Sequence, residues 1–216
     1  MYLPSLEEIV MRLIIVLPAL TFHEFAHAYS ADKLGDPTPR NMGRLTLNPI
    51  AHIDPIGTVI LPIFLRFGWA KPVPINPLNF RSPERGSLIT SAAGPAANLM
   101  QAIVVGLALR LALALVPGGW LLSHRQGAGL AVGLLFALTS VNVMLAIFNL
   151  IPLGPLDGHH IVEALLPYPQ LQVYRQFNQY GFIVLIAMIF LLPGLLHVVV
   201  FIPADVAASV LTGLAR

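Results

Sequence analysis

The sequence of 216 residues contains no cysteine and very few charged residues. Without cysteine the chain can form no disulfide, no thiolate metal site and no cysteine nucleophile. Charged residues make up 10% of the chain, against about 25% in an ordinary soluble domain, and apolar residues reach 56%. The mean hydropathy is +0.79. A soluble fold could not bury so much apolar surface, so the composition predicts an integral membrane protein.

The scarcity of charge also excludes one class of partner. The formal net charge is only +2, scattered between apolar runs, so nucleic-acid binding is not expected. Glu7 and Glu8 precede the first apolar run, and residues 1–12 lack a small-residue cleavage site, so no removable signal peptide is predicted. The loops are too short for a second core, and residues 1–216 are expected to form one integral-membrane domain.

Four apolar stretches are long enough to cross a bilayer, which takes about 20 residues of helix. The first of them contains Pro18 and the histidine motif described below, and the last is interrupted by Pro193 and Gly194. These stretches cover residues 9–34, 88–116, 127–151 and 182–202.

Three further segments fall short of a span. Residues 53–67 are apolar but too short and contain two prolines, so they are expected to dip into the membrane without crossing it. Residues 68–80 are rich in proline and alternate Val73 with Ile75, which indicates an extended interfacial segment. A short strand is possible at residues 45–47. The predicted fold class is therefore an all-α polytopic membrane protein with about four to six membrane segments and a short extended or β interfacial loop.

The segment His23-Glu24-Phe25-Ala26-His27 lies inside the first apolar stretch. On a helix the two histidines lie one turn apart on one face and can bind one metal ion, while Glu24, about 100° round the axis, can reach a water on that ion. Ionisable residues cost about 2.5 to 3.5 kcal/mol in mid-membrane and are functional by default. The alternative is a pair of helix-packing histidines with Glu24 hydrogen-bonded to a neighbouring helix.

A tetrahedral zinc site needs a third protein ligand. Asp157 is the strongest candidate, because it follows a charge-free span within a segment that two prolines and two glycines break. The alternative is that Asp157 caps the amphipathic segment at residues 159–166. The other carboxylates near apolar stretches are Asp32, Asp54, Glu163 and Asp205.

Three motifs in this order resemble the site-2 protease family of intramembrane zinc metalloproteases. They are His23-Glu24-Phe25-Ala26-His27, Gly94-Pro95-Ala96-Ala97-Asn98 and Asn149-Leu150-Ile151-Pro152-x-x-Pro155-x-Asp157-Gly158. The resemblance covers about residues 23–166. It implies His23, His27 and Asp157 as ligands of one Zn²⁺ per chain, and Glu24 as the catalytic base. Many relatives carry Pro-x-Pro-Pro where this chain reads Pro152-Leu153-Gly154-Pro155, a departure that bears on the stiffness of this loop.

The resemblance also implies a function and a location. Members of the family hydrolyse peptide bonds within or near transmembrane segments of membrane-protein substrates, so the implied partners are such a substrate and the lipid bilayer. A chain of this size resembles the small members without a PDZ or nucleotide-binding domain, in a prokaryotic cell membrane. The family implies that Asn149 hydrogen-bonds the substrate or intermediate, whereas a role in satisfying the broken helix end is the alternative. Asn98 is read as a helix-packing residue, with direct substrate contact as the alternative.

Other interpretations remain open. His52 could approach the metal as a gate or an accessory ligand, or it could be a plain interfacial residue before a helix that begins at Asp54-Pro55. Residues 68–80 could pair with an unwound substrate by strand addition, or form an interfacial loop anchored by Trp69. A non-proteolytic metal transporter or scaffold is the alternative function. A transporter would need polar residues along several spans, and an intact Glu24 argues against a scaffold.

Overall fold

A computed structural model describes residues 5–60, 68–116 and 125–214, and within these ranges it contains helices but no β-strand. The prediction of an all-α polytopic protein is thereby confirmed. The helices are, in chain order, α1 (Leu6–Leu34), α2 (Thr38–Asn41), η1 (Pro49–His52), η2 (Pro55–Ile60), η3 (Pro77–Asn79), α4 (Pro83–Leu115), α6 (Arg125–Asn149), α7 (Asp157–Leu165), α8 (Tyr168–Asn178), α9 (Gly181–Leu191), α10 (Pro193–Leu196), η4 (His197–Phe201) and α11 (Ile202–Thr212).

Four described helical stretches are long and apolar enough to cross a membrane: Leu6–Leu34, Pro83–Leu115, Gly127–Asn149 and Pro193–Thr212. The last one corrects the expected span at residues 182–202. The preceding helix ends at Leu192, whose φ of −127° and ψ of 48° are not helical. Pro193 then begins a new helix, because a proline fits the first turn of a helix but not its interior. The apolar helix Gly181–Leu191 therefore stands apart as a shorter element.

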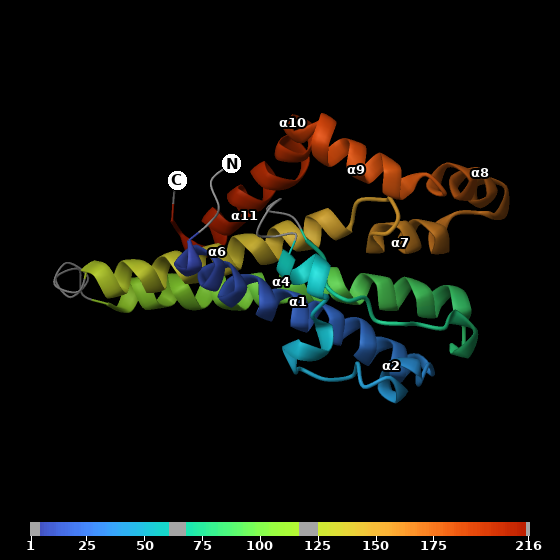
Figure 1. Ribbon diagram of the computed structural model, residues 1–216, viewed down its shortest axis with the longest axis horizontal. Helices are drawn as coiled ribbons and strands as arrows, with labels where there is room; N and C mark the ends of the chain where they lie inside the picture. Colours follow the sequence, from blue (N-terminus) through green and yellow to red (C-terminus); the bar gives the residue numbers. More distant parts are fainter. Residues whose placement is uncertain (1–4, 61–67, 117–124, 215–216) are drawn as a thin grey trace.

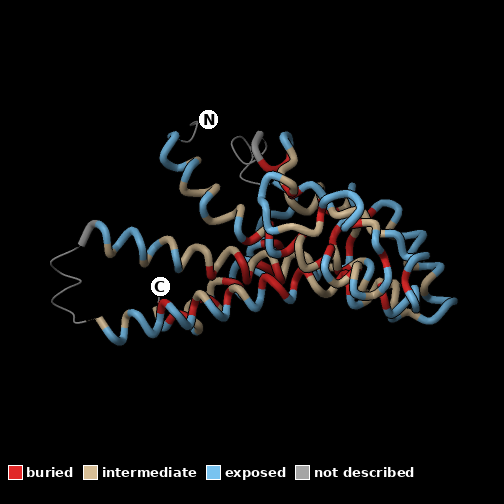
Figure 2. Tube along the Cα trace, turned by 90° about the horizontal axis from the view of Figure 1, so that it is seen from below, coloured by how far each residue is buried: buried red, intermediate tan, exposed pale blue. Residues whose placement is uncertain are grey.

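The long helices meet in one bundle. Figure 1 shows α4 and α6 side by side along the longest axis, with α1 crossing them and the α8 to α11 segment lying above. Ala102, Val143 and Ala204 form a buried cluster where α4, α6 and α11 meet, because small residues let the helix backbones approach closely. Buried residues in Figure 2 follow these contact lines, whereas the outer faces are exposed. Exposed apolar side chains such as Val104 and Leu111 suit a lipid-facing surface.

Helix α1 begins and ends with sequence-encoded caps. Ser5 and Glu8 form a capping box, in which Ser5 Oγ accepts from the Glu8 amide at 3.2 Å and Glu8 Oε2 accepts from the Ser5 amide at 3.1 Å. Gly35 ends the helix at φ 112°, in the left-handed region where a side chain would be strained. These two ends fix the length of the helix that carries both histidines.

The connection after α2 is not a sheet. Residues 45 and 46 form bends and residue 47 has no regular structure, so the possible strand is not formed; residues 68–76 also lack regular structure before the 3₁₀ turn η3. Asp54 Oδ1 accepts from the amides of Ile56 and Gly57, so the predicted helix start at Asp54-Pro55 is confirmed, although η2 is a π-helix. The remainder of the expected short membrane segment, residues 61–67, lies outside the described residues.

Asp36, which directly follows the end of α1, hydrogen-bonds to residues at the end of this connection. Its carboxylate accepts from the Asn76 amide at 2.7 Å, from Asn79 Nδ2 at 2.7 Å and from the Thr38 amide at 3.1 Å. Burial raises the pKa of Asp36, but these donors outweigh it and hold the pKa below its ordinary value. The extended segment is thus fixed against the helix that carries the candidate site.

Candidate metal centre

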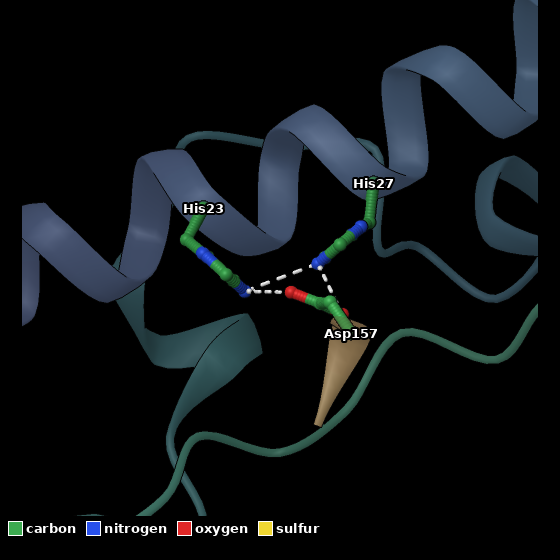
Figure 3. A group of neighbouring side chains, drawn as sticks. All are labelled: His23, His27 and Asp157. Carbon is green, nitrogen blue, oxygen red and sulfur yellow. Dashed lines mark hydrogen bonds and ion pairs between the residues drawn. The ribbon is translucent and has the colours of Figure 1, made fainter. Parts of the chain in front are cut away.

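The structure brings His23, His27 and Asp157 together, from the middle of α1 and the first residue of α7 (Figure 3). The two Nε2 atoms are 3.0 Å apart. Asp157 Oδ2 lies 3.3 Å from His23 Nε2, and Asp157 Oδ1 lies 3.3 Å from His27 Nε2. Both imidazoles are buried, and Asp157 is half-buried. Three ligand atoms from distant parts of the chain therefore surround one point.

Contacts behind the histidines determine which ring nitrogen carries the proton. His27 Nδ1 lies 2.7 Å from the Thr90 carbonyl, which can only accept, so Nδ1 is the donor. His23 Nδ1 lies 2.6 Å from Asn98 Oδ1. The orientation of the Asn98 amide is fixed because its Nδ2 donates to Ala19 O at 3.0 Å and to Asn142 Oδ1 at 2.8 Å. In the neutral form, in which histidine binds metals, both side chains therefore present the lone pair of Nε2 to the centre.

This arrangement suits a cation. Two Nε2 lone pairs at 3.0 Å cannot hydrogen-bond each other, and the buried Asp157 Oδ2 has no hydrogen-bond partner among the described residues. Two imidazole nitrogens and one carboxylate oxygen form a donor set that Zn²⁺ accepts.

Gly94 allows α4 to lie directly against the centre. A Cβ atom at this position would be 2.3 Å from His27 Nε2 and 2.7 Å from His23 Nε2. Any other residue there would have to displace an imidazole or α4. The role of Gly94 was not predicted, although the Gly94-Pro95 pair inside an apolar helix was a visible signal.

Glu24 lies on α1 beside the two candidate ligands and is buried. Its Oε2 accepts a hydrogen bond of 3.1 Å from the backbone amide of Val73, in the segment at residues 68–76. One carboxylate oxygen is thus oriented by the backbone. The placement is that expected of a group next to a metal-bound water, and Val73 was not predicted to orient it.

Arg44 holds the same extended segment from behind. Its guanidinium is buried and donates to the carbonyls of Pro72, at 3.1 Å, and Lys71. The Lys71 amide donates back to the carbonyl of His52 at 2.9 Å. These contacts fix the residues immediately before Val73. Sequence reasoning missed Arg44, because only the fold shows that its partners are main-chain carbonyls.

His52 lies in this supporting layer. Its Nε2 donates to the Thr46 carbonyl at 2.9 Å, and Arg44 lies 3.4 Å from its Nδ1. His52 is not among the described residues that group around the centre. Its role as a gate or accessory ligand stays a prediction.

The two open alternatives for Asn149 and Asp157 can be compared with their contacts. Asn149 Nδ2 donates to the Leu145 carbonyl at 3.0 Å, one turn back on α6, as expected of a residue that completes a helix end. Its substrate role stays a prediction. Asp157 is the first residue of α7, Leu156 is the N-cap, and no side chain caps the helix. Asn98, read as a packing residue, packs three helices and also fixes His23.

Comparisons with known proteins point in the same direction. Residues 123–192 match the model of peptidase family M50. A protein named a candidate zinc metalloprotease, YwhC of Bacillus subtilis, is 39% identical over 182 residues, which cover 81% of this chain and 78% of YwhC. This chain belongs to peptidase family M50. The resemblance to site-2 proteases is thereby confirmed.

More distant members of the family are longer. Rip2 of Mycolicibacterium smegmatis, which is also named a candidate zinc metalloprotease, is 30% identical over 176 residues, which cover 80% of this chain and 64% of Rip2. Rip2 of Mycobacterium tuberculosis H37Rv is 29% identical over 184 residues, which cover 83% of this chain and 66% of Rip2. No solved structure matches the chain. Membership of M50, with four helices able to span a bilayer, supports a membrane-embedded intramembrane protease over a non-proteolytic transporter or scaffold.

Proposed function

We propose that the chain is a zinc-dependent endopeptidase that cuts membrane-protein substrates within or near their transmembrane segments. Residues 1–216 would act as one domain, in a prokaryotic cell membrane. One observation carries the proposal. Two imidazole Nε2 atoms converge with a carboxylate oxygen of Asp157 that has no hydrogen-bond partner among the described residues, and both histidines and buried Glu24 lie on a helix long enough to span a bilayer.

His23, His27 and Asp157 would hold one Zn²⁺, which when bound lowers the pKa of water and polarises a carbonyl group. Glu24 would take the proton of the attacking water and deliver it to the leaving amine. The Val73 amide keeps one Glu24 oxygen oriented during both transfers. Asn149 would donate to the developing oxyanion, for which its Nδ2 must leave the Leu145 carbonyl.

The extended segment supports the expected strand addition by a substrate. Val73 donates its N–H to Glu24, so the segment runs directly beside the candidate catalytic base. A substrate strand that adds to this segment would therefore lie next to that base.

A cavity of about 700 Å³ offers space for an apolar substrate segment. Its wall comes from α1, α6 and the α10 to η4 region, and includes Leu20, Leu145 and Phe148. Leu20 lies one turn before His23 and Glu24, and Phe148 directly precedes Asn149. An apolar helix seated there would end close to the candidate centre.

Metal analysis of the detergent-purified protein, paired with cleavage of a model single-span substrate, tests the proposal. We expect about one zinc per chain. Glu24→Gln should retain the zinc and lose cleavage, because it removes the base and no ligand. Glu84→Gln, at an exposed glutamate in the first turn of α4, is the matched control and should cleave like wild type. A wild type without zinc, or a Glu24→Gln variant as fast as wild type, would overturn the proposal.

A further inference from the structure

Helix α8 holds the loop that carries Asp157. Asn178, the last residue of α8, accepts a hydrogen bond of 2.9 Å from the Gly154 amide through its Oδ1. Its Nδ2 lies 2.6 Å from His159 Nδ1. Gly154 precedes Asp157 by three residues and His159 follows it by two. One side chain therefore bridges the chain on both sides of the candidate ligand.

A hydrogen bond from Tyr174 and close packing at Gly181 also hold α8 and the start of α9 against this loop. The Tyr174 hydroxyl, one turn earlier on α8, donates to the Pro152 carbonyl at 3.0 Å. Gly181, at the start of α9, has no room for a side chain, since a Cβ there would be 2.7 Å from Asn178 Oδ1 and 2.9 Å from the Gly154 nitrogen. The corner between α8 and α9 is thus fitted to this loop.

The loop has few restraints of its own. Pro152 and Pro155 have no N–H, and within the loop only short turns are formed, such as Leu153 N to Ile151 O at 2.8 Å. Position 154 is where this chain departs from Pro-x-Pro-Pro. Glycine leaves φ free, whereas proline would fix it. Glycine also has the backbone N–H that donates a hydrogen bond to Asn178 Oδ1, whereas a proline would have no N–H at this position.

We propose that Asn178 is a positioning residue, which replaces the missing proline by fixing the Gly154 backbone and thereby the Asp157 carboxylate. The inference rests on the proposed function, in which Asp157 is a metal ligand. The Asn178 amide can work in one orientation only, because Gly154 N–H requires an acceptor. His159 Nδ1 must then accept from Nδ2, which places the His159 proton on Nε2.

Metal affinity measures this positioning directly. Asn178→Ala should weaken Zn²⁺ binding, measured by competition with a chelator, by roughly tenfold, as loss of a residue that orients a ligand does. The absorption spectrum of the Co²⁺-substituted protein should change with it. Gln179→Ala is the control, because this exposed neighbour donates only to the Gln176 carbonyl among its described side-chain contacts. An Asn178→Ala variant with wild-type affinity and an unchanged Co²⁺ spectrum would overturn the inference.

A double-mutant cycle separates positioning from general stability. Gly154→Pro removes the N–H and places its ring against Asn178 Oδ1, so alone it should also weaken Zn²⁺ binding. Combined with Asn178→Ala, the proline ring has space and restores the stiffness of the loop. The double variant should therefore bind Zn²⁺ more tightly than either single variant. Effects that simply add would contradict the proposed exchange of roles.

Hydrogen exchange of the metal-free protein distinguishes this inference from the proposed function. The peptide covering residues 150–157 should exchange at least tenfold faster in Asn178→Ala than in wild type, because the Gly154 amide loses its acceptor. If wild type binds no zinc, the proposed function fails, while faster exchange still supports Asn178 as the residue that fixes the loop. Unchanged exchange overturns the inference even if the wild type binds zinc and cleaves.

Discussion

Two groups in the described part of the chain each combine two histidines with one carboxylate, yet they differ in chemistry. His23, His27 and Asp157 form the first group, and His159, His160 and Glu163 form the second. In each group the ligand atoms lie within 4.8 Å of one another. Residue type and proximity alone therefore do not separate a metal site from a polar cluster.

The contacts behind the ligands do separate them. In the first group both Nδ1 atoms face acceptors, so both Nε2 lone pairs point inward. In the second group Asn178 donates to His159 Nδ1, so the proton of neutral His159 sits on Nε2, facing Glu163 at 3.8 Å. Glu163 also accepts from Arg175 Nε at 2.9 Å, which already provides its positive partner. The inward-facing lone pairs of the first group suit a bound cation, whereas in the second group Arg175 already supplies a positive charge beside the carboxylate.

The strongest test of this difference removes the carboxylate of each group. Asp157→Ala should abolish stoichiometric zinc binding and cleavage, because a site with two histidines is incomplete. Glu163→Ala should keep about one zinc per chain, since the second group holds none. Metal content after dialysis against zinc-containing buffer provides the measurement. Equal zinc in wild type and Asp157→Ala would move the third ligand elsewhere, with His52 and Asp54 as the next candidates.

Gly94→Ala should have almost as large an effect without touching a ligand. The added methyl group would lie 2.3 Å from His27 Nε2, so an imidazole or α4 must move, and zinc binding should fall at least a hundredfold. Gly133→Ala on α6 is the matched control, because nothing lies within 4 Å of its added methyl group. It should bind zinc normally. Wild-type zinc affinity in Gly94→Ala would show that the centre is less closely packed than described.

Asn98 should contribute a smaller amount, through His23. Asn98→Ala removes the acceptor for His23 Nδ1 and should weaken zinc binding by roughly 10- to 100-fold, the usual cost of losing such a partner. Asn98→Asp keeps an oxygen acceptor and should recover part of this loss. The ratio of the two zinc dissociation constants is the measurement. If Asn98→Asp binds zinc no better than Asn98→Ala, Asn98 only packs the helices.

The sequence predicted those parts of the candidate site that lie within continuous motifs. His23, Glu24 and His27 follow one another on one helix, so their spacing already places them around one point. Asp157 stood out because it follows a charge-free span, in a segment that two prolines and two glycines break. The spans near the centre followed from apolar length, and only the last was wrong, because Pro193 begins a helix and does not interrupt one.

The parts that could not be predicted depend on contacts between segments distant in the chain. Arg44 and Val73 act through main-chain groups, which leave no mark on residue type. Asn178 is an ordinary polar residue until α8 is packed against Gly154. Gly94 was visible as a helix glycine, but only the approach of α4 to the histidines explains it. Periodicity and composition report burial, not these individual partners.

The smallest expected effect concerns the second group and pH. Burial lowers the pKa of His159, nearby His160 and Arg175 lower it further, and Glu163 raises it. An unfolded histidine takes up its proton near pH 6.5, whereas His159 in the folded protein resists it, so stability falls as the pH drops below about 6.5 and levels off below the folded pKa. Protonated His159 cannot accept from Asn178, so α8 should loosen.

A spin label at a single cysteine reports this loosening, since the chain has no other cysteine. Val173→Cys places the label on the exposed side of α8, away from Tyr174, whose ring stacks on His159 at 5.8 Å. The label should become modestly more mobile between about pH 7.5 and pH 5. In Asn178→Ala it should already be mobile at the higher pH, and in His159→Gln the pH response should disappear. A full pH response in His159→Gln would assign the titration to another group, and the second cluster would then have no part in holding α8.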